Sequence, residues 1–153
     1  FVCGRWRVTG VPVPGGHLYL NDAVICTAAI LLDPLGTFFV GGVGAFLGDF
    51  FFYPAPMFVS LVTHGLQAVV VSLCAHKLTK EHRGCGALVG VILGIVINVA
   101  GYSVGRALVY ATPEAAMLKF PFQVFQAAFG AAVSMLLCFK AGLLTFWDKF
   151  SQR

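Results

Sequence analysis

The sequence predicts an all-α, polytopic membrane bundle, and three observations carry this prediction. Of the 153 residues, 59% are hydrophobic and 10% are charged, whereas a soluble domain carries about 25% charged residues. The mean hydropathy is +0.89. The charges fall between long uncharged runs, as in helices that cross a bilayer. This composition excludes an ordinary cytosolic enzyme, a disordered tail and a nucleic-acid-binding protein.

The uncharged runs predict five spans within a single integral membrane domain, residues 1–153. A helix needs about 20 residues to cross about 30 Å of hydrocarbon. The expected spans lie at about 20–33, 34–51, 57–76, 84–111 and 121–147. Residues 1–6 read as the last turns of a further helix, so we expect a six-helix plan with the first helix largely missing from this sequence.

The breaks between spans come from proline, glycine and charge. Pro54 and Pro56 separate the second span from the third. The first expected span has only ten residues, mostly apolar, between Asp22 and Asp33, about 15 Å of helix. A segment that short must be buried among its neighbours. Loops are expected at 8–22, 33–36, 52–56, 77–83 and 112–121.

Basic residues predict the orientation, because cytoplasmic loops are enriched in Lys and Arg. The loop at 77–83 carries Lys77, Lys80 and Arg83, and the C-terminal end carries Lys149 and Arg153. Two spans separate these regions, so both can lie on the cytoplasmic side. The loops at 8–22, 52–56 and 112–121 then face outward.

No motif in the sequence indicates catalysis, metal binding or nucleotide binding. The five cysteines form no CxxC pair, and we interpret them as small core residues. The four histidines are scattered, without an HExxH motif or a Walker-type glycine-rich loop. We therefore expect no catalytic residue, no metal and no cofactor in this chain.

The polar residues of the spans gather in the outer half of the predicted membrane. Such residues are costly in a bilayer and usually face a cavity or the bundle interior. Asn98, Tyr102 and Arg106 share one helix face by their spacing of four. We predict a polar pocket on the outer side, with the following substrate-binding candidates: His64, Gln67, Asn98, Tyr102, Arg106, Gln123, Gln126, Asn21 and Tyr53.

Each candidate has a structural alternative. The His and amide side chains can instead bond neighbouring helices, Arg106 can extend to the outer interface, and the tyrosines can be interfacial aromatics. For Asp22 we favour a helix-capping role, and for Asp49 pairing or loop capping. Lys140 is expected to extend to the inner interface.

Small residues at four-residue spacing predict close helix packing. They serve either internal packing or the docking of a partner membrane protein. The partner-packing candidates are Gly44, Gly48, Gly86, Gly90 and Gly94.

Four function classes remain to be compared. A membrane enzyme would need a catalytic motif, and a proton-coupled carrier would need acidic residues at mid-depth, whereas Asp22, Asp33 and Asp49 fall at predicted helix ends. A structural subunit would need no outward polar pocket. A substrate-capturing subunit that takes its energy from partners fits best, and a stand-alone secondary carrier is the alternative.

Three segments resemble the substrate-binding S components of energy-coupling factor (ECF) vitamin transporters. They are residues 18–23 (LYLNDA), residues 41–49 (GGVGAFLGD) and Tyr53-Pro54. Family members often read GYxNLGD, then a glycine-rich helix that ends in Asp, then a Tyr-Pro loop. Here Asn21 and Asp22 are adjacent, without the Leu-Gly between them. The resemblance covers about residues 8–70 by motif and the whole chain by helix plan.

The resemblance implies a six-helix bundle in the bacterial plasma membrane that binds a water-soluble vitamin at its outer side. It also implies a transmembrane coupling protein (T component) and two cytoplasmic ATPases as partners, so that ATP is used outside this chain. The lipid bilayer and the vitamin are the other expected partners, and no nucleic acid is expected.

The candidate side chains suit a small, neutral ring that forms hydrogen bonds. Pyridoxine or hydroxymethylpyrimidine is the preferred substrate. Arg106 leaves a carboxylate such as pantothenate as the alternative.

Overall fold

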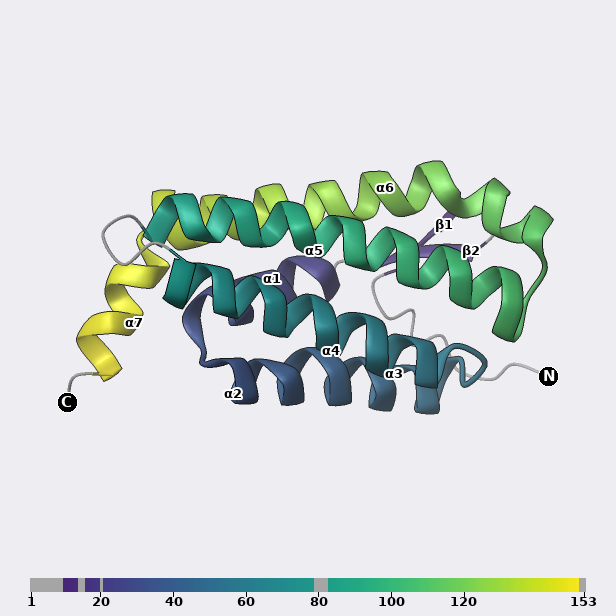
Figure 1. The fold of residues 1–153 in the computed structure, drawn as a ribbon, viewed down its shortest axis with the longest axis horizontal. Coiled ribbons are helices and arrows are strands. Elements are labelled where there is room, and N and C mark those ends of the chain that lie inside the picture. Colours follow the sequence, from purple (N-terminus) through teal and green to yellow (C-terminus); the bar gives the residue numbers. More distant parts are fainter. Residues whose placement is uncertain (1–9, 14–15, 20, 79–82, 152–153) are drawn as a thin grey trace.

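The computed structural model describes residues 10–13, 16–19, 21–78 and 83–151. It confirms the all-α membrane bundle: among the described residues, four helices are long and apolar enough to cross a membrane. Figure 1 shows three of them, α4, α5 and α6, running side by side along the length of the molecule, with α2 and α3 following one another beneath α4. The short α1 lies inside the bundle.

The long helices each contain a five-residue π-helical segment. The first comprises α2 (Pro34–Phe38), η1 (Phe39–Val43) and α3 (Gly44–Phe52). The others are α4 (Met57–Leu73) with η2 (Cys74–Leu78), α5 (Arg83–Gly105) with η3 (Arg106–Tyr110), and α6 (Pro113–Met135) with η4 (Leu136–Lys140). They have 19, 22, 28 and 28 residues, respectively.

The short first span is α1 (Asn21–Leu31), and its apolar residues form the core of the bundle. Ala29 and Ile30 have relative exposures of 0% and 1%. They pack in one cluster with Val71 of α4 and Val91 of α5. An 11-residue helix is about 16 Å long and cannot cross the bilayer, so its ends lie among neighbouring helices, as the sequence requires.

The predicted loop at 8–22 is wrong in part. Residues 10–19 contain two antiparallel strands, β1 (Gly10–Val13) and β2 (Gly16–Tyr19), in the register Gly10 to Tyr19. The strands precede α1 directly, and β2 contacts α6. The expected helical fragment at residues 1–6 lies outside the described residues.

The boundaries of the last expected span, 121–147, are also wrong. The helix begins at Pro113, because Thr112 Oγ1 accepts a hydrogen bond from the Ala115 amide and caps it. Pro121 lies inside this helix instead of starting it. At the other end Gly142 has φ +73°, a left-handed conformation that favours glycine and ends the helix. A separate helix, α7 (Leu143–Ser151), follows.

A polar cluster ties α7 to the rest of the bundle. Arg83 Nη1 donates to both carboxylate oxygens of Asp148 at 3.1 Å. Arg83 Nη2 also lies 3.2 Å from His76 Nε2 of η2. In Figure 1, α7 is angled away from the long helices at the end of the bundle where α5 begins.

The orientation is a prediction that surface labelling can test. Lys77 is exposed in η2, in the most basic of the loop regions. In a variant without the native cysteines, Lys77→Cys in intact cells is expected to resist a membrane-impermeant thiol reagent and to react after permeabilisation. A matched cysteine at the exposed Tyr53 position should react without permeabilisation. Labelling of the Lys77 position from outside would reverse the assigned topology.

The five glycines expected to dock a partner divide into two groups. Gly44 and Gly48 of α3 are exposed, and a Cβ added at Gly48 would meet nothing within 4 Å. Gly86, Gly90 and Gly94 of α5 are buried within the chain. A Cβ on Gly90 would lie 2.9 Å from Cys74 Cβ of η2, and a Cβ on Gly94 would lie 2.9 Å from Val71 Cγ2 of α4. The expectation of partner packing is therefore corrected for Gly90 and Gly94, which let α4 and α5 approach closely.

Alanine substitution should distinguish the two groups. A Cβ on Gly90 would lie 2.9 Å from Cys74 Cβ and 3.0 Å from the Val71 carbonyl oxygen. Because backbone must move, Gly90→Ala is expected to destabilise the fold by about 1–3 kcal/mol. Gly48→Ala is the control and should be neutral or slightly stabilising, since alanine favours helix. Thermal unfolding in detergent measures both; equal melting temperatures would contradict the contact.

Candidate functional site

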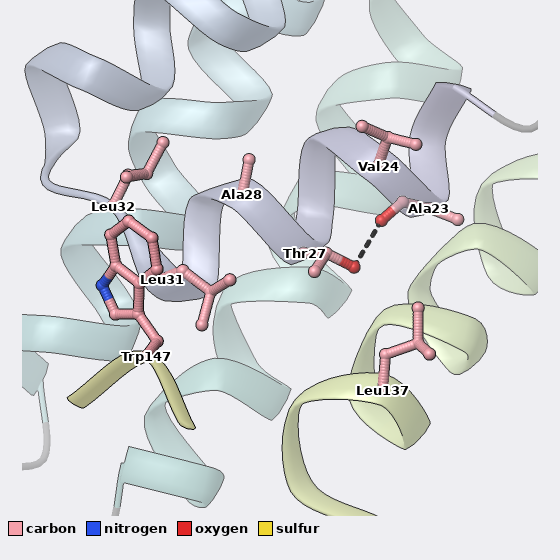
Figure 2. Close-up of a pocket in the computed structure, with 8 residues that line it drawn as sticks. All are labelled: Ala23, Val24, Thr27, Ala28, Leu31, Leu32, Leu137 and Trp147. Carbon is pink, nitrogen blue, oxygen red and sulfur yellow. Dashed lines mark hydrogen bonds between the residues drawn. The ribbon is translucent and has the colours of Figure 1, made fainter. Parts of the chain in front are cut away.

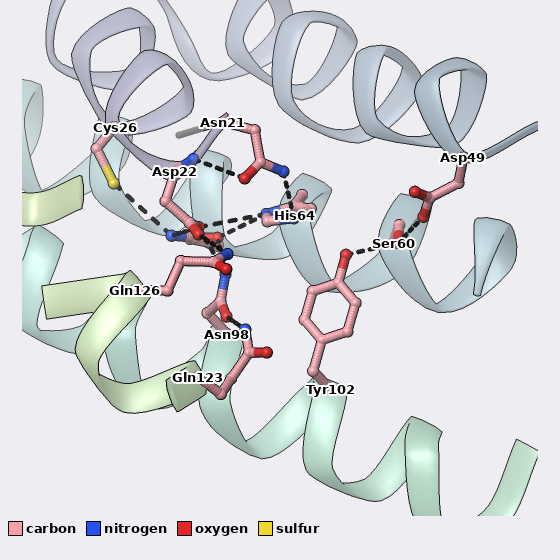
Figure 3. A network of polar contacts seen from close by, with 11 residues as sticks. Asn21, Asp22, Cys26, Asp49, Ser60, His64, Asn98, Tyr102, Gln123 and Gln126 are labelled. Atoms are coloured by element: carbon pink, nitrogen blue, oxygen red, sulfur yellow. Dashed lines mark hydrogen bonds and ion pairs between the residues drawn. The ribbon is translucent and has the colours of Figure 1, made fainter. Parts of the chain in front are cut away.

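Polar side chains of three helices converge on the carboxylate of Asp22, which lies in the first turn of a fourth helix, α1 (Figure 3). This side chain is completely buried, at 0% exposure. Asn98 Nδ2 of α5 donates to its Oδ1 at 2.7 Å, and Gln126 Nε2 of α6 donates to its Oδ2 at 2.7 Å. Gln67 Nε2 of α4 lies 3.4 Å from Oδ1. Asp22 is thus the common acceptor of the cluster.

Local structure explains how a carboxylate is tolerated at this depth. The Asp22 backbone N–H donates to Asn21 Oδ1 at 3.0 Å, so Asn21 satisfies an amide at the start of the helix. The positive end of the α1 dipole favours a negative charge in the first turn. On α6, a Cβ added at Gly130 would lie only 2.6 Å from Asp22 Cβ. Because Gly130 has no side chain, the N-terminus of α1 can pack directly against α6.

The hydrogen bonds fix the orientation of the amide side chains. Because a carboxylate only accepts, each amide turns its NH₂ group toward Asp22. Asn98 Nδ2 also donates to Gln67 Oε1 at 3.0 Å, and Asn98 Oδ1 accepts from Gln123 Nε2 at 2.6 Å. The amide NH₂ groups of Gln67, Asn98 and Gln126 therefore point toward Asp22, and the carbonyl oxygens of these side chains point away from it.

The same logic fixes the tautomer of His64. Its Nδ1 lies 2.9 Å from Gln67 Oε1, and its Nε2 lies 3.4 Å from Asn21 Nδ2. Gln67 Oε1 can only accept, so Nδ1 carries the proton; the Asn21 amide donates, so Nε2 accepts. His64 therefore fits this arrangement as a neutral imidazole. Its Nδ1 is 3.8 Å from Asp22 Oδ1.

A second polar group extends from His64 toward Asp49 of α3. The rings of His64 and Tyr102 meet edge to face, with centroids 5.3 Å apart. Ser60 Oγ donates its one hydrogen to the Asp49 carboxylate. It therefore accepts a hydrogen bond from the Tyr102 hydroxyl. Figure 3 shows this second group beside the Asp22 cluster, so that polar contacts follow one another from buried Asp22 to half-buried Asp49.

The structure brings most of the predicted substrate-binding residues together. Those joined to the network by hydrogen bonds are Asn21, His64, Gln67, Asn98, Tyr102, Gln123 and Gln126. Two lie apart from these contacts. The Arg106 guanidinium sits over the Tyr110 ring, 5.8 Å from its centroid, and Tyr53 is 57% exposed beyond the end of α3.

Sequence reasoning missed four members of the network: Asp22, Cys26, Asp49 and Ser60. Cys26 is the acceptor of a long contact from Gln67 Nε2 at 3.7 Å. Asp22 was expected to cap a helix, but its carboxylate accepts hydrogen bonds from Asn98 and Gln126 on other helices. The short length of the first expected span was a signal for Asp22. A helix too short to cross the membrane must start inside the bundle, so a carboxylate in its first turn is buried in the bundle too. Asp49 was expected to pair or to cap a loop, and Ser60 carried no comparable signal.

Two apolar grooves lie outside this network. One is formed by α1, η4 and α7, between Ala28, Leu31 and Trp147 among others (Figure 2). The one polar side chain there, Thr27, returns its hydroxyl to the Ala23 carbonyl at 2.7 Å. The other groove lies between α5 with η3 and α6. Both are lined almost wholly by carbon and are suited to acyl chains or helices, not to a polar ligand.

Comparison with known proteins places this bundle in context. A family model described as "ECF-type riboflavin transporter, S component" matches residues 1–142. Three UPF0397 proteins of Streptococcus agalactiae, from serotype Ia, V and III strains, are each 27% identical to the chain over 96 residues. The match covers 61% of this chain and 53% of each relative, so the chain spans about half the length of the curated relatives it matches.

Proposed function

Because the chain belongs to the S-component family of ECF-type riboflavin transporters, we propose that it is a membrane subunit that captures a small, water-soluble vitamin or vitamin precursor. One observation supports the proposal most directly. Side chains of α4, α5 and α6 converge on one buried carboxylate of α1 within a bundle of membrane-spanning length. Polar groups of this density are costly in a bilayer and mark substrate paths or sites.

The proposed division of labour follows from the family. The S component binds the ligand at the outer side, and a T component with two cytoplasmic ATPases supplies the energy for delivery into the cell. We propose the bacterial plasma membrane as the location. The chain acts by binding, not by catalysis, and ATP is used by the partner subunits.

The amide-rich network supports a hydrogen-bonding heteroaromatic ring as the ligand. Pyridoxine or hydroxymethylpyrimidine remains the preferred substrate, since amide donors and acceptors together with the edges of His64 and Tyr102 suit such rings. Pantothenate was considered because of Arg106. That side chain lies over Tyr110, so its contact no longer supports an anionic ligand.

Binding and transport measurements on the purified chain distinguish a substrate-capturing subunit from a stand-alone secondary carrier. The purified chain is titrated calorimetrically with pyridoxine, hydroxymethylpyrimidine, riboflavin, thiamine and pantothenate, and is also reconstituted alone into proteoliposomes. Saturable binding without accumulation against a gradient is expected. Accumulation driven by an imposed ion gradient would show a stand-alone carrier. A folded protein that binds none of the five would overturn vitamin capture.

The placement of the site is tested by His64→Ala. His64 has 1% exposure and lies between Gln67 and Tyr102. Removing one ligand partner should weaken affinity roughly 5- to 150-fold, equivalent to about 1–3 kcal/mol. His76→Ala, in η2 directly after α4, is the matched control, and its affinity should equal that of the parent. Equal affinity in both variants, with normal melting, would place the site elsewhere.

A further inference from the structure

We propose that α7 lies along a lipid–water interface that contains anionic lipid, with Phe146 and Phe150 among acyl chains and nearby lysines against the headgroups. Three observations support this placement: the faces of α7, the turn by which the chain leaves the last long helix, and the charges at this end of the bundle. The placement is independent of the ligand that the bundle captures.

One face of α7 is apolar and exposed. Phe146 and Phe150 are four residues apart and therefore share this face, and their exposures are 66% and 69%. Their rings stack with the centroids 6.5 Å apart and an interplanar angle of 18° or less, at 15°, so the two side chains form one continuous surface. Moving aromatic rings from water into hydrocarbon is favourable, so this face is suited to an apolar partner.

The remaining faces of α7 have different surroundings. Leu144 packs against the core cluster, and Trp147 lines the groove beside α1. Thr145 and Lys149, also four residues apart, are exposed and polar. A helix with one apolar exposed face and one polar exposed face is typical of the membrane interface, where the apolar face lies about 5–10 Å into the boundary between headgroups and acyl chains.

The turn before α7 puts the helix at the end of the membrane-spanning segments. Gly142, with φ +73°, ends the last long helix, and α7 is angled away from the long helices instead of extending them (Figure 1). Its nine residues form about 14 Å of helix, too short to cross a bilayer. The Arg83–Asp148 ion pair, at 3.1 Å, holds α7 at the start of α5, where hydrocarbon meets headgroups.

The charges at this end complement an anionic surface. The exposed basic side chains of the described residues there are Lys77, Lys140 and Lys149. The nearby carboxylates are engaged within the protein: Asp148 is bound to Arg83, and Asp33 accepts from the amides that begin α2. A lysine near a membrane surface favours anionic lipid by about fivefold. A bilayer offers acyl chains and anionic headgroups side by side, and so matches both exposed faces of α7.

Spin labels on single cysteines test which face of α7 meets lipid. Phe150→Cys and the matched control Thr145→Cys are made in the full chain without its native cysteines and reconstituted into vesicles of phosphatidylcholine and phosphatidylglycerol. The label at position 150 should collide more with oxygen, which concentrates in lipid, than with a water-soluble nickel chelate, and the label at position 145 should show the reverse. Preferential collision with the chelate at position 150 would put this face in water. Shielding from both reagents would show that a second copy covers it. Either result would overturn the proposal.

Quenching by brominated lipids tests the preference for anionic headgroups. Phe150→Trp is the single fluorophore, with both native tryptophans replaced by Phe, and the bromine is carried either by phosphatidylglycerol or by phosphatidylcholine in otherwise identical mixed vesicles. Brominated phosphatidylglycerol is expected to quench more strongly. Adding Lys140→Gln and Lys149→Gln should make the two lipids quench equally, whereas the control Arg106→Gln, in η3 at the far end of α5, should keep the difference. Equal quenching before any lysine is changed, or an undiminished difference without both lysines, would overturn the proposal.

Discussion

Asp22→Ala is expected to abolish measurable ligand binding and to cause a large loss of stability. The carboxylate is the acceptor for Asn98 and Gln126 at 2.7 Å and for Gln67 at 3.4 Å. Its removal leaves buried donors without partners, each costing about 1–3 kcal/mol. Calorimetric titration and thermal unfolding in detergent give the two readouts.

The matched control is Asp33→Ala. Asp33 is also the aspartate at a helix start, but it is exposed and accepts from the Leu35 and Gly36 amides as the cap of α2. Loss of this cap should cost about 0.5–2 kcal/mol and leave affinity unchanged. If the two variants behave alike, Asp22 is a cap and the network has no part in binding.

Asn98→Asp is expected to be nearly as damaging, although it changes no volume. Asn98 is fully buried, and its Nδ2 lies 2.7 Å from Asp22 Oδ1. A second carboxylate at that distance cannot ionise beside the first without strong repulsion. An uncompensated buried charge costs about 3–5 kcal/mol, so the melting temperature should fall sharply and binding should be lost.

The exchange of the two side chains tests the coupling. In the double variant Asp22→Asn with Asn98→Asp, one carboxylate and one amide again face each other, so stability should recover by at least half of the loss in Asn98→Asp. A double-mutant cycle from thermal or chemical unfolding measures this coupling energy. Additive losses would show that residues 22 and 98 do not form the short contact.

The sequence allowed the membrane bundle and most of the polar site to be predicted. Hydropathy and helix length depend on local composition, so the long helices that carry His64, Asn98 and Gln126 could be expected from uncharged runs. That these side chains belong to the bundle interior follows from the cost of polar groups in lipid. Helix spacing alone then put Asn98 and Tyr102 on one face of α5.

The helix boundaries were harder to predict from the sequence. Pro121 was expected to begin the last span, but the Thr112 cap and Pro113 start the helix earlier. Membrane helices tolerate an interior proline because neighbouring groups satisfy the freed backbone. The end at Gly142 depends on a left-handed backbone conformation, which glycine permits but does not require. At each boundary, several local sequence signals, such as a proline, a capping residue or a glycine, favour different end points with similar strength.

The roles of Asp22 and Asp33 show what the sequence by itself determined and what only the tertiary structure decided. Sequence position makes both carboxylates candidates for capping, and composition determines that they lie in a membrane bundle. Asp33 is a cap at the surface, whereas Asp22 is buried against Gly130 and meets Gln67, Asn98 and Gln126 from three other helices. Partners 45, 76 and 104 residues away along the chain are set by helix packing, which no local pattern specifies.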